Sequence, residues 1–278
     1  MRFTKMHGIG NDYIYINCFE QKIDNPEELA ISMSHRQFGV GGDGIVLIMP
    51  SDCADVRMRM YNIDGSEGKM CGNASRCVGK FAFERGLVAK DVMTLETASG
   101  IKTLYLTVHD GDVSRVRVDM GTPVLSSRDI PLSFDGSNID VPITTAFSCA
   151  PVTCVSMGNP HAVMFTDGID ALDLAKIGPM YEKNSLFPQG VNTEFVEVIS
   201  DTELKMRVWE RGSGETLACG TGACAIVVAA VLKGYAKRGQ DVAVHLRGGE
   251  LTIKWDENTV WMTGSATFVF DGELCDKE

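Results

Sequence analysis

The feature that most constrains this chain is an internal repeat, because the sequence matches itself when it is shifted by 148 positions. Two Cys-Gly steps, Cys71-Gly72 and Cys219-Gly220, define the offset. Other uncommon residues coincide at the same offset without a gap: Gly10-Asn11 with Gly158-Asn159, Gly42 with Gly190, Glu67 with Glu215, and Arg85-Gly86 with Lys233-Gly234. So many matches at one offset indicate a duplication, so we expect two similar halves.

The residues around each Cys-Gly step predict the same local structure in both halves. Apolar residues alternate over 56 to 60 and over 204 to 208, as in half-buried strands, and each run leads into its Cys-Gly step. A helical pattern follows each step, ending at Gly86 in the first half and covering residues 220 to 232 in the second. The second helix is apolar nearly all round, and both helices should be buried.

Further strand-like runs surround these helices and are separated by Gly, Asp and Asn turns. They cover residues 13 to 16, 101 to 108, 113 to 118, 242 to 246 and 259 to 262. The pattern predicts the α+β class, with two pseudo-symmetric domains that each wrap a mostly antiparallel sheet around a central helix. We expect an N-terminal half of residues 1–118 completed by 265–278, and a C-terminal half of residues 119–264. The active site is expected in the cleft between the halves.

Composition narrows the classes of function. A net charge of -11 argues against a sequence-independent hold on nucleic acid or on an anionic membrane, and favours a small-molecule partner. The first residues lack the apolar stretch of a secretory signal, and no segment is long enough to span a bilayer, so we expect a cytoplasmic protein. Nine cysteines without a CxxC pair indicate free thiols in a reducing compartment and argue against a structural zinc site.

Cys71 and Cys219 have the setting of acid-base catalysts. Each precedes a predicted helix, whose unpaired N–H groups and dipole should lower the thiol pKa from about 8.5. If a pseudo-twofold axis relates the halves, the two thiols approach one substrate carbon from opposite faces. One thiolate can then remove a proton while the other thiol returns one, which inverts the stereocentre. The backbone N–H groups expected to hold the substrate carboxylate are those of Gly72, Asn73, Gly220 and Thr221.

The repeat loses its symmetry beside the second thiol. Glu210 aligns with Asn62, and Arg211 aligns with Ile63. A carboxylate can pair with an ammonium group and a guanidinium with a carboxylate, so this step suits a zwitterionic substrate.

Short motifs recur along both halves in a fixed order. The first half contains Lys5-Met6-His7-Gly8-Ile9-Gly10-Asn11-Asp12, Gly39-Val40-Gly41-Gly42-Asp43-Gly44, Tyr61-Asn62-Ile63-Asp64-Gly65-Ser66 and Cys71-Gly72-Asn73. The second contains Gly158-Asn159-Pro160-His161, Asn192-Thr193-Glu194-Phe195, Glu210-Arg211-Gly212 and Cys219-Gly220-Thr221-Gly222-Ala223-Cys224. In this order and spacing they resemble the diaminopimelate epimerase family over almost the whole chain.

The resemblance implies an isomerase that converts LL-2,6-diaminopimelate to the meso isomer without pyridoxal phosphate, metal or other cofactor. It places this reaction in the biosynthesis of lysine and of peptidoglycan precursors, and it implies a homodimer. Carried over by position, Cys71 and Cys219 are the acid-base pair, Glu210 is the partner of the reacting amino group, and His161 tunes the thiols. The positions that resemble substrate-holding residues are Asn11, Asn62, Asn159, Asn192 and Arg211. Gly44 departs from relatives that carry Gln there, and we leave it out of the site.

Several alternatives remain open. The same fold and cysteine pair could serve a proline racemase or hydroxyproline epimerase, and the duplicated fold a phenazine-type isomerase. Cys219 and His161 could form a nucleophile-base pair for acyl transfer, or the fold could bind a ligand without catalysis. Residues 39 to 44 lack the phosphate-binding glycine patterns, so a substrate loop is preferred there. The cysteines expected to serve core packing are Cys18, Cys53, Cys77, Cys149, Cys154, Cys224 and Cys275.

Overall fold

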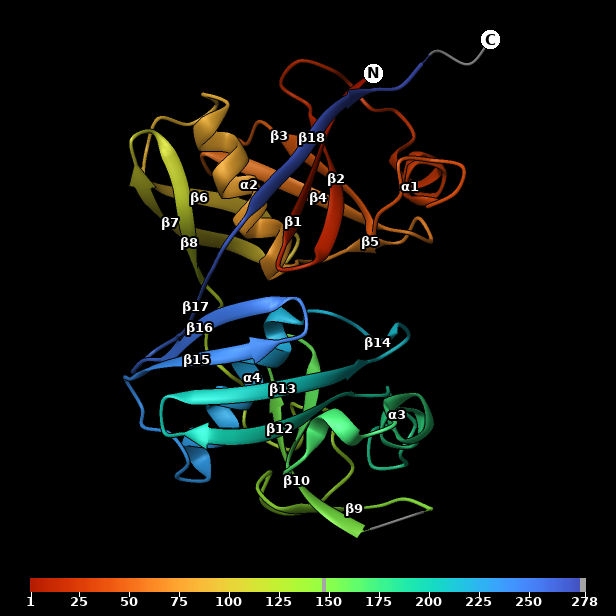
Figure 1. Cartoon of the computed structure of the whole chain (residues 1–278), viewed down its shortest axis with the longest axis vertical. Coiled ribbons are helices and arrows are strands. Elements are labelled where there is room, and N and C mark those ends of the chain that lie inside the picture. Colours follow the sequence, from red (N-terminus) through yellow and green to blue (C-terminus); the bar gives the residue numbers. More distant parts are fainter. Residues whose placement is uncertain (147–148, 276–278) are drawn as a thin grey trace. The chain divides into compact units, whose positions relative to one another are not determined.

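The computed structural model describes residues 1–146 and 149–275, and the chain divides into two compact units (Figure 1). Unit 1 consists of Met1–Asp119 and Thr263–Glu278, and unit 2 of Met120–Met262. Residues 276–278 of the expected C-terminal segment 265–278 lie outside the described residues. No helix in the described part of the chain is both long enough and apolar enough to cross a membrane.

Unit 1 is built on one mixed sheet. Its strands are β1 (Arg2–Gly8), β2 (Asn11–Asn17), β3 (Gly44–Met49), β4 (Val56–Asn62), β5 (Glu67–Gly68), β6 (Val92–Thr97), β7 (Gly100–His109), β8 (Asp112–Asp119) and β18 (Thr267–Glu273). They lie in the order β18-β1-β2-β3-β4-β6-β7-β8, with β5 paired to β4. Among these pairings β2–β3 and β4–β6 are parallel, and the others are antiparallel.

Two helices pack against this sheet. The central helix α2 (Gly72–Glu84) contacts strands from both ends of the sheet, including β1, β7 and β8, so the sheet wraps around it (Figure 1). A second helix, α1 (Pro26–Ser34), packs its Ala30 and Met33 into a core with Ile14 and Ile45. Strand residues alternate in direction, so the sheet can bury one row of side chains against each helix.

Unit 2 repeats this plan. Its strands are β9 (Val141–Thr144), β10 (Cys149–Ser156), β11 (Pro160–Phe165), β12 (Asn192–Ser200), β13 (Glu203–Glu210), β14 (Gly214–Glu215), β15 (Asp241–Leu246) and β16 (Gly249–Trp255), followed by β17 (Val260–Gly264) at the end of the unit. The order is β9-β10-β11-β12-β13-β15-β16, with β14 paired to β13 and with β11–β12 and β13–β15 parallel. The helices are η1 (Ile169–Ala171), α3 (Leu174–Glu182) and the central α4 (Gly220–Leu232).

The duplication holds at the level of individual pairings. Helices α2 and α4 both have 13 residues, and both begin one residue after the repeated cysteine. The pairing of Ile14 with Ile45 recurs as that of Ala162 with Thr193, at the same offset. The predicted α+β class with two similar halves, each a mostly antiparallel sheet around a central helix, is confirmed.

The offset changes by one residue after the central helices. Val56 pairs with Leu95 in unit 1, whereas its repeat partner Leu204 pairs with Val244. Unit 2 therefore carries one additional residue between α4 and β15, where a connecting turn can absorb it without disturbing the sheet.

The remaining cysteines fall into two groups. Cys77, Cys154 and Cys224 are fully buried, as expected. The same expectation was wrong for Cys53, Cys149 and Cys275, which are exposed, and only partly right for Cys18, which is half-buried. The three exposed residues lie in the β3–β4 connection, at the first residue of β10 and after the end of β18.

Candidate active site

Cys71 caps the central helix of unit 1. Its backbone is extended, and its sulfur accepts a hydrogen bond from the Ala74 N–H at 3.5 Å. The half-buried thiol donates to Oδ1 of Asn11, the first residue of β2, at 3.4 Å. Two groups therefore hold the sulfur, one from the helix and one from the sheet.

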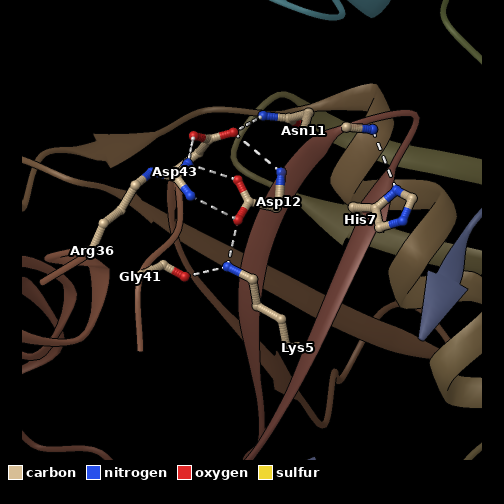
Figure 2. Close-up of polar contacts among 8 residues, drawn as sticks. Lys5, His7, Asn11, Asp12, Arg36, Gly41 and Asp43 are labelled. Carbon is tan, nitrogen blue, oxygen red and sulfur yellow. Dashed lines mark hydrogen bonds and ion pairs between the residues drawn. The ribbon is translucent and has the colours of Figure 1, made fainter. Parts of the chain in front are cut away.

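The Asn11 amide is held at its other end by Asp43. Asn11 Nδ2 donates to Asp43 Oδ2 at 2.8 Å, and the Asp12 backbone N–H donates to the same oxygen at 3.1 Å (Figure 2). The other carboxylate oxygen of Asp43 accepts from Arg36 at 3.1 Å. Asp43 thus places a charged acceptor behind Asn11.

A second carboxylate continues this network (Figure 2). Asp12 forms ion pairs with Lys5 at 2.6 Å and with Arg36 at 3.0 Å. Burial raises the pKa of Asp12, but Arg36 and Lys5 outweigh burial and lower the pKa below its ordinary value. Burial and the neighbouring Asp12 carboxylate raise the pKa of Asp43.

The other predicted residues of unit 1 have structural partners of their own. Asn73 is buried, and its Oδ1 accepts from the fully buried Arg76 at 2.9 Å. Arg76 also donates to the carbonyl of Gly72 at 3.4 Å, so the two residues brace the first turn of α2. Asn62 ends β4, where its Nδ2 donates to Ser66 Oγ at 3.0 Å.

Cys219 caps the central helix of unit 2 in the same way. Its sulfur accepts from the Gly222 N–H at 3.3 Å and lies 3.5 Å from Thr221 Oγ1. Cys219 is buried, with only 5% of its surface exposed, whereas Cys71 is half-buried.

Two carboxylates change the chemistry of the second thiol. Burial, then Glu210, then Glu194 raise the pKa of Cys219 well above its usual value, against the opposing effects of Thr221 and the Gly222 N–H. The expected lowering of the pKa was therefore wrong for Cys219, because desolvation and negative charge outweigh the helix amides. Burial also raises the pKa of Glu210, which shares hydrogen bonds with Thr216 and with the Cys219 thiol.

Glu194 and His161 form a buried pair. His161 Nδ1 lies 2.7 Å from Glu194 Oε1, and both side chains are fully buried. The other ring nitrogen of His161 lies 3.0 Å from Asn159 Oδ1. Among the described residues Glu194 Oε2 has no hydrogen-bond partner. A Cβ added at Gly222 would lie 2.7 Å from Glu194 Oε1, so only glycine leaves room for this carboxylate at the start of α4.

This pair is specific to unit 2. At the same repeat positions unit 1 has Tyr13, Val46 and Ala74, where unit 2 has His161, Glu194 and Gly222. A largely apolar cluster in one half is therefore replaced by a titratable pair, together with the glycine that accommodates it. His161 pairs with Glu194, whose carboxylate in turn raises the pKa of Cys219.

Asn192 and Arg211 lie together at the start of β12 and the end of β13. Asn192 Nδ2 donates to the Pro160 carbonyl at 3.1 Å, and its Oδ1 accepts from the Arg211 backbone N–H at 2.9 Å. The Arg211 guanidinium donates to the Gln189 carbonyl at 2.8 Å. Unit 2 thus gathers Cys219, Glu210 and their neighbours, and unit 1 gathers Asn11 and Asn73 around Cys71.

Comparison with known proteins places this geometry in a family. The model of the family described as "Diaminopimelate epimerase" matches residues 3–126 and 153–269. The chain belongs to the diaminopimelate epimerase family. A diaminopimelate epimerase of Acetivibrio thermocellus is 57% identical, with 99% of this chain and 98% of that protein covered. One of Desulfovibrio desulfuricans is 57% identical over 98% of each chain. One of Methanococcus maripaludis is 54% identical over 99% of each.

Solved structures share the diaminopimelate epimerase fold at low identity. A probable proline racemase from Agrobacterium radiobacter aligns with a TM-score of 0.75 at 17% identity, covering 99% of this chain and 93% of that one. A phenazine biosynthesis protein from Bacillus anthracis gives 0.72 at 16%, covering 99% of each chain. At these identities the likeness shows the fold alone.

Gly44 has no room for a side chain in this member of the family. Its φ is +155°, and an added Cβ would overlap the Tyr61 carbonyl and lie 2.8 Å from Tyr13 Cε1. The backbone at this position of the chain therefore requires glycine.

Two residues of the site were not predicted. Asp43 belongs to the glycine-rich motif, and Glu194 lies in the buried first half of β12, between Thr193 and Phe195. A charged residue within a buried strand was the available signal for Glu194. The described residues contain no group of three or more His, Cys, Asp or Glu side chains that could hold a metal ion.

Proposed function

We propose that this chain interconverts LL-2,6-diaminopimelate and meso-2,6-diaminopimelate by two-base proton transfer at the α-carbon, without a cofactor. The observation that carries the proposal is the recurrence of a helix-capping cysteine at the same position of both units, in a chain of the diaminopimelate epimerase family. Two equivalent sulfur atoms, one from each half, are what inversion of a stereocentre requires.

In this scheme Cys71 and Cys219 reach opposite faces of one carbon. One thiolate removes the α-proton, the bonding pair stays on the carbon as a carbanion, and the other thiol delivers a proton to the opposite face. The roles exchange in the reverse direction. The scheme requires both units to present the first turns of α2 and α4 to one ligand.

The charges around Cys219 suggest how its proton is managed. With a raised pKa, Cys219 is held as the thiol in the free protein. An α-ammonium group bound by Glu210 would neutralise part of the field that raises this pKa, so substrate itself would increase the fraction of Cys219 present as the thiolate. Glu194, with His161 behind it, would set the remaining negative field.

The first turns of the two helices supply the electrostatic stabilisation. Intrahelical hydrogen bonds begin at Ser75 and at Ala223, and the capping sulfurs use the N–H groups of Ala74 and Gly222. We assign the preceding N–H groups to the substrate α-carboxylate, where charge grows as the proton leaves. These are the N–H groups of Gly72, Asn73, Gly220 and Thr221.

The distal end of the substrate is assigned to the amide and guanidinium groups. Asn62, Asn159, Asn192 and Arg211 carry donors and acceptors suited to a second ammonium and carboxylate pair. A cyclic imino acid has no such distal group. The purified protein should therefore convert LL-diaminopimelate to the meso isomer, as followed by chiral chromatography, and should leave L-proline unchanged. Equal turnover of proline would contradict the assignment.

We also propose that the protein is a cytoplasmic homodimer. Its product, meso-diaminopimelate, would supply the synthesis of lysine and of peptidoglycan precursors. Sedimentation at micromolar concentration tests the dimer, and a monomer that is fully active would contradict it.

A further inference from the structure

We propose that Asp43 is a positioning residue for the reaction, because it fixes which end of the Asn11 amide faces the Cys71 thiol. This inference rests on the proposed function. It gives the glycine-rich segment of residues 39 to 44 a role other than phosphate binding. Figure 2 shows Asp43 beside Asn11, together with the charged groups that hold Asp43 in place.

The direction of the Asn11 amide follows from the chemistry of its two neighbours. An ionised carboxylate only accepts hydrogen bonds, so the contact of 2.8 Å with Asp43 requires the NH₂ end of Asn11. The carbonyl end must then face Cys71, and Asn11 Oδ1 accepts the thiol hydrogen at 3.4 Å. If the amide were reversed, its oxygen would face the Asp43 carboxylate, where there is no hydrogen to accept, and its NH₂ group would face Cys71. Asp43 therefore decides whether the sulfur meets an acceptor or a donor.

Asp43 itself is held at both oxygens. Arg36 binds Oδ1, and the Asp12 N–H shares Oδ2 with Asn11. The Asp43 N–H in turn donates to the Asp12 carbonyl at 2.7 Å. A carboxylate with these partners cannot rotate away from Asn11 without breaking several charge-assisted or backbone hydrogen bonds.

The glycines of the segment explain how Asp43 reaches this position. A Cβ at Gly42 would lie 2.8 Å from Lys5 Nζ, and Gly41 has a φ of +82°. Lys5 donates to the carbonyl of Gly41 and pairs with Asp12 (Figure 2). The glycines thus let the chain pass close to Lys5 and place Asp43 beside Asn11.

Unit 2 lacks this device. The repeat partner of Asp43 is Val191, and that of Asp12 is Pro160. The repeat partner of Asn11, Asn159, instead presents its Oδ1 to His161. The two equivalent amides are therefore oriented by different groups, and Asp43 acts on the first thiol alone.

A double-mutant cycle tests the proposal. The rates of LL to meso conversion are measured for the wild type, Asp43→Ala, Asn11→Ala and the double variant, with folding checked by thermal melting. Asp43→Ala should lower kcat at least about 10-fold. In the Asn11→Ala background the same change should cost less than about twofold, because Asp43 acts through Asn11. The proposal would be overturned if the loss of kcat in the double variant equalled the product of the losses in the two single variants. An unchanged kcat in Asp43→Ala would also overturn it.

Two further variants separate positioning from folding. Asp55 is a matched control, since its carboxylate also accepts a backbone N–H, that of Thr94, but has no link to Asn11. Asp55→Ala should lower the melting temperature and leave kcat within about twofold. If Asp43→Ala does not fold, the isosteric Asp43→Asn replaces it in the cycle, and its loss of kcat should again disappear without Asn11. Wild-type activity alone tests the proposed function, so failure of the cycle in an active enzyme rejects only the role of Asp43.

Discussion

Cys71 and Cys219 cap two equivalent helices by accepting the same kind of backbone N–H hydrogen bond, yet the groups that face the two sulfur atoms differ in charge. Cys71 meets the neutral carbonyl of Asn11, whereas Cys219 lies in the field of Glu210 and Glu194. The two units therefore share the same helix-capping geometry but surround the two thiols with different charges. This difference makes the two thiols separately testable.

Glu194→Gln should make Cys219 more reactive toward alkylation. The Glu194 carboxylate raises the pKa of Cys219, so its neutral replacement should lower that pKa and increase the thiolate fraction at any pH below it. The midpoint of iodoacetamide labelling against pH, read on the Cys219 peptide by mass spectrometry, should move to lower pH. Glu197→Gln on the same strand serves as the control. An unchanged or higher midpoint would show that Glu194 does not act on this thiol.

Each of the two helix-capping cysteines should be indispensable for turnover. Cys71→Ala and Cys219→Ala should each lower the rate of LL to meso conversion by about 10³-fold or more, since inversion needs a thiol on each face and one face then has none. Cys53→Ala, at an exposed thiol, should retain full activity. An active Cys71→Ala variant that forms a thioester through Cys219 would favour acyl transfer instead.

Glu210→Gln should reduce turnover by about 100-fold, because the proposed mechanism assigns the reacting amino group to this carboxylate beside Cys219. The comparison is Glu203→Gln, which breaks a partly exposed contact with His245 and should change the rate little. Initial rates at saturating substrate measure both. Similar rates for the two variants would remove Glu210 from the site.

Gly44→Ala should destabilise the fold more than Gly86→Ala. Both glycines have positive φ, so alanine is strained at either position, by about 1–2 kcal/mol. Nothing lies within 4 Å of an added Cβ at Gly86, whereas one at Gly44 overlaps the Tyr61 carbonyl. The free energy of unfolding in urea should therefore fall by about 3 kcal/mol or more for Gly44→Ala. Equal losses would show that the backbone near Tyr61 moves aside freely.

The repeat made much of the fold predictable. A fixed offset between two Cys-Gly steps located α4 at residues 220 to 232, and the alternation of apolar residues located strands such as β7 and β15. Helices α1 and α3 were not expected. Both have only nine residues; the sequence of α1 is weakly amphipathic, and α3 contains Gly178 and Pro179.

The site was less predictable where residues act through partners distant in sequence. The ionisation of Cys219 depends on Glu194 and Glu210, which come from neighbouring strands, so a rule based on the helix start alone gave the wrong direction. Asp43 gains its role only when β2 and β3 pair and bring it beside Asn11. Periodicity reports which face of a strand is buried but carries no information on such cross-strand contacts.

In the proposed mechanism one thiol removes the proton from one face of the α-carbon and a different thiol delivers a proton to the other face. Conversion of LL-diaminopimelate in heavy water tests it most directly, with mass spectra of both isomers taken during the first few per cent of reaction. The account predicts that newly formed meso isomer carries one deuterium while the remaining LL isomer stays unlabelled. Deuterium entering the LL isomer as fast as the meso isomer would mean that a single base serves both faces, and would contradict the account.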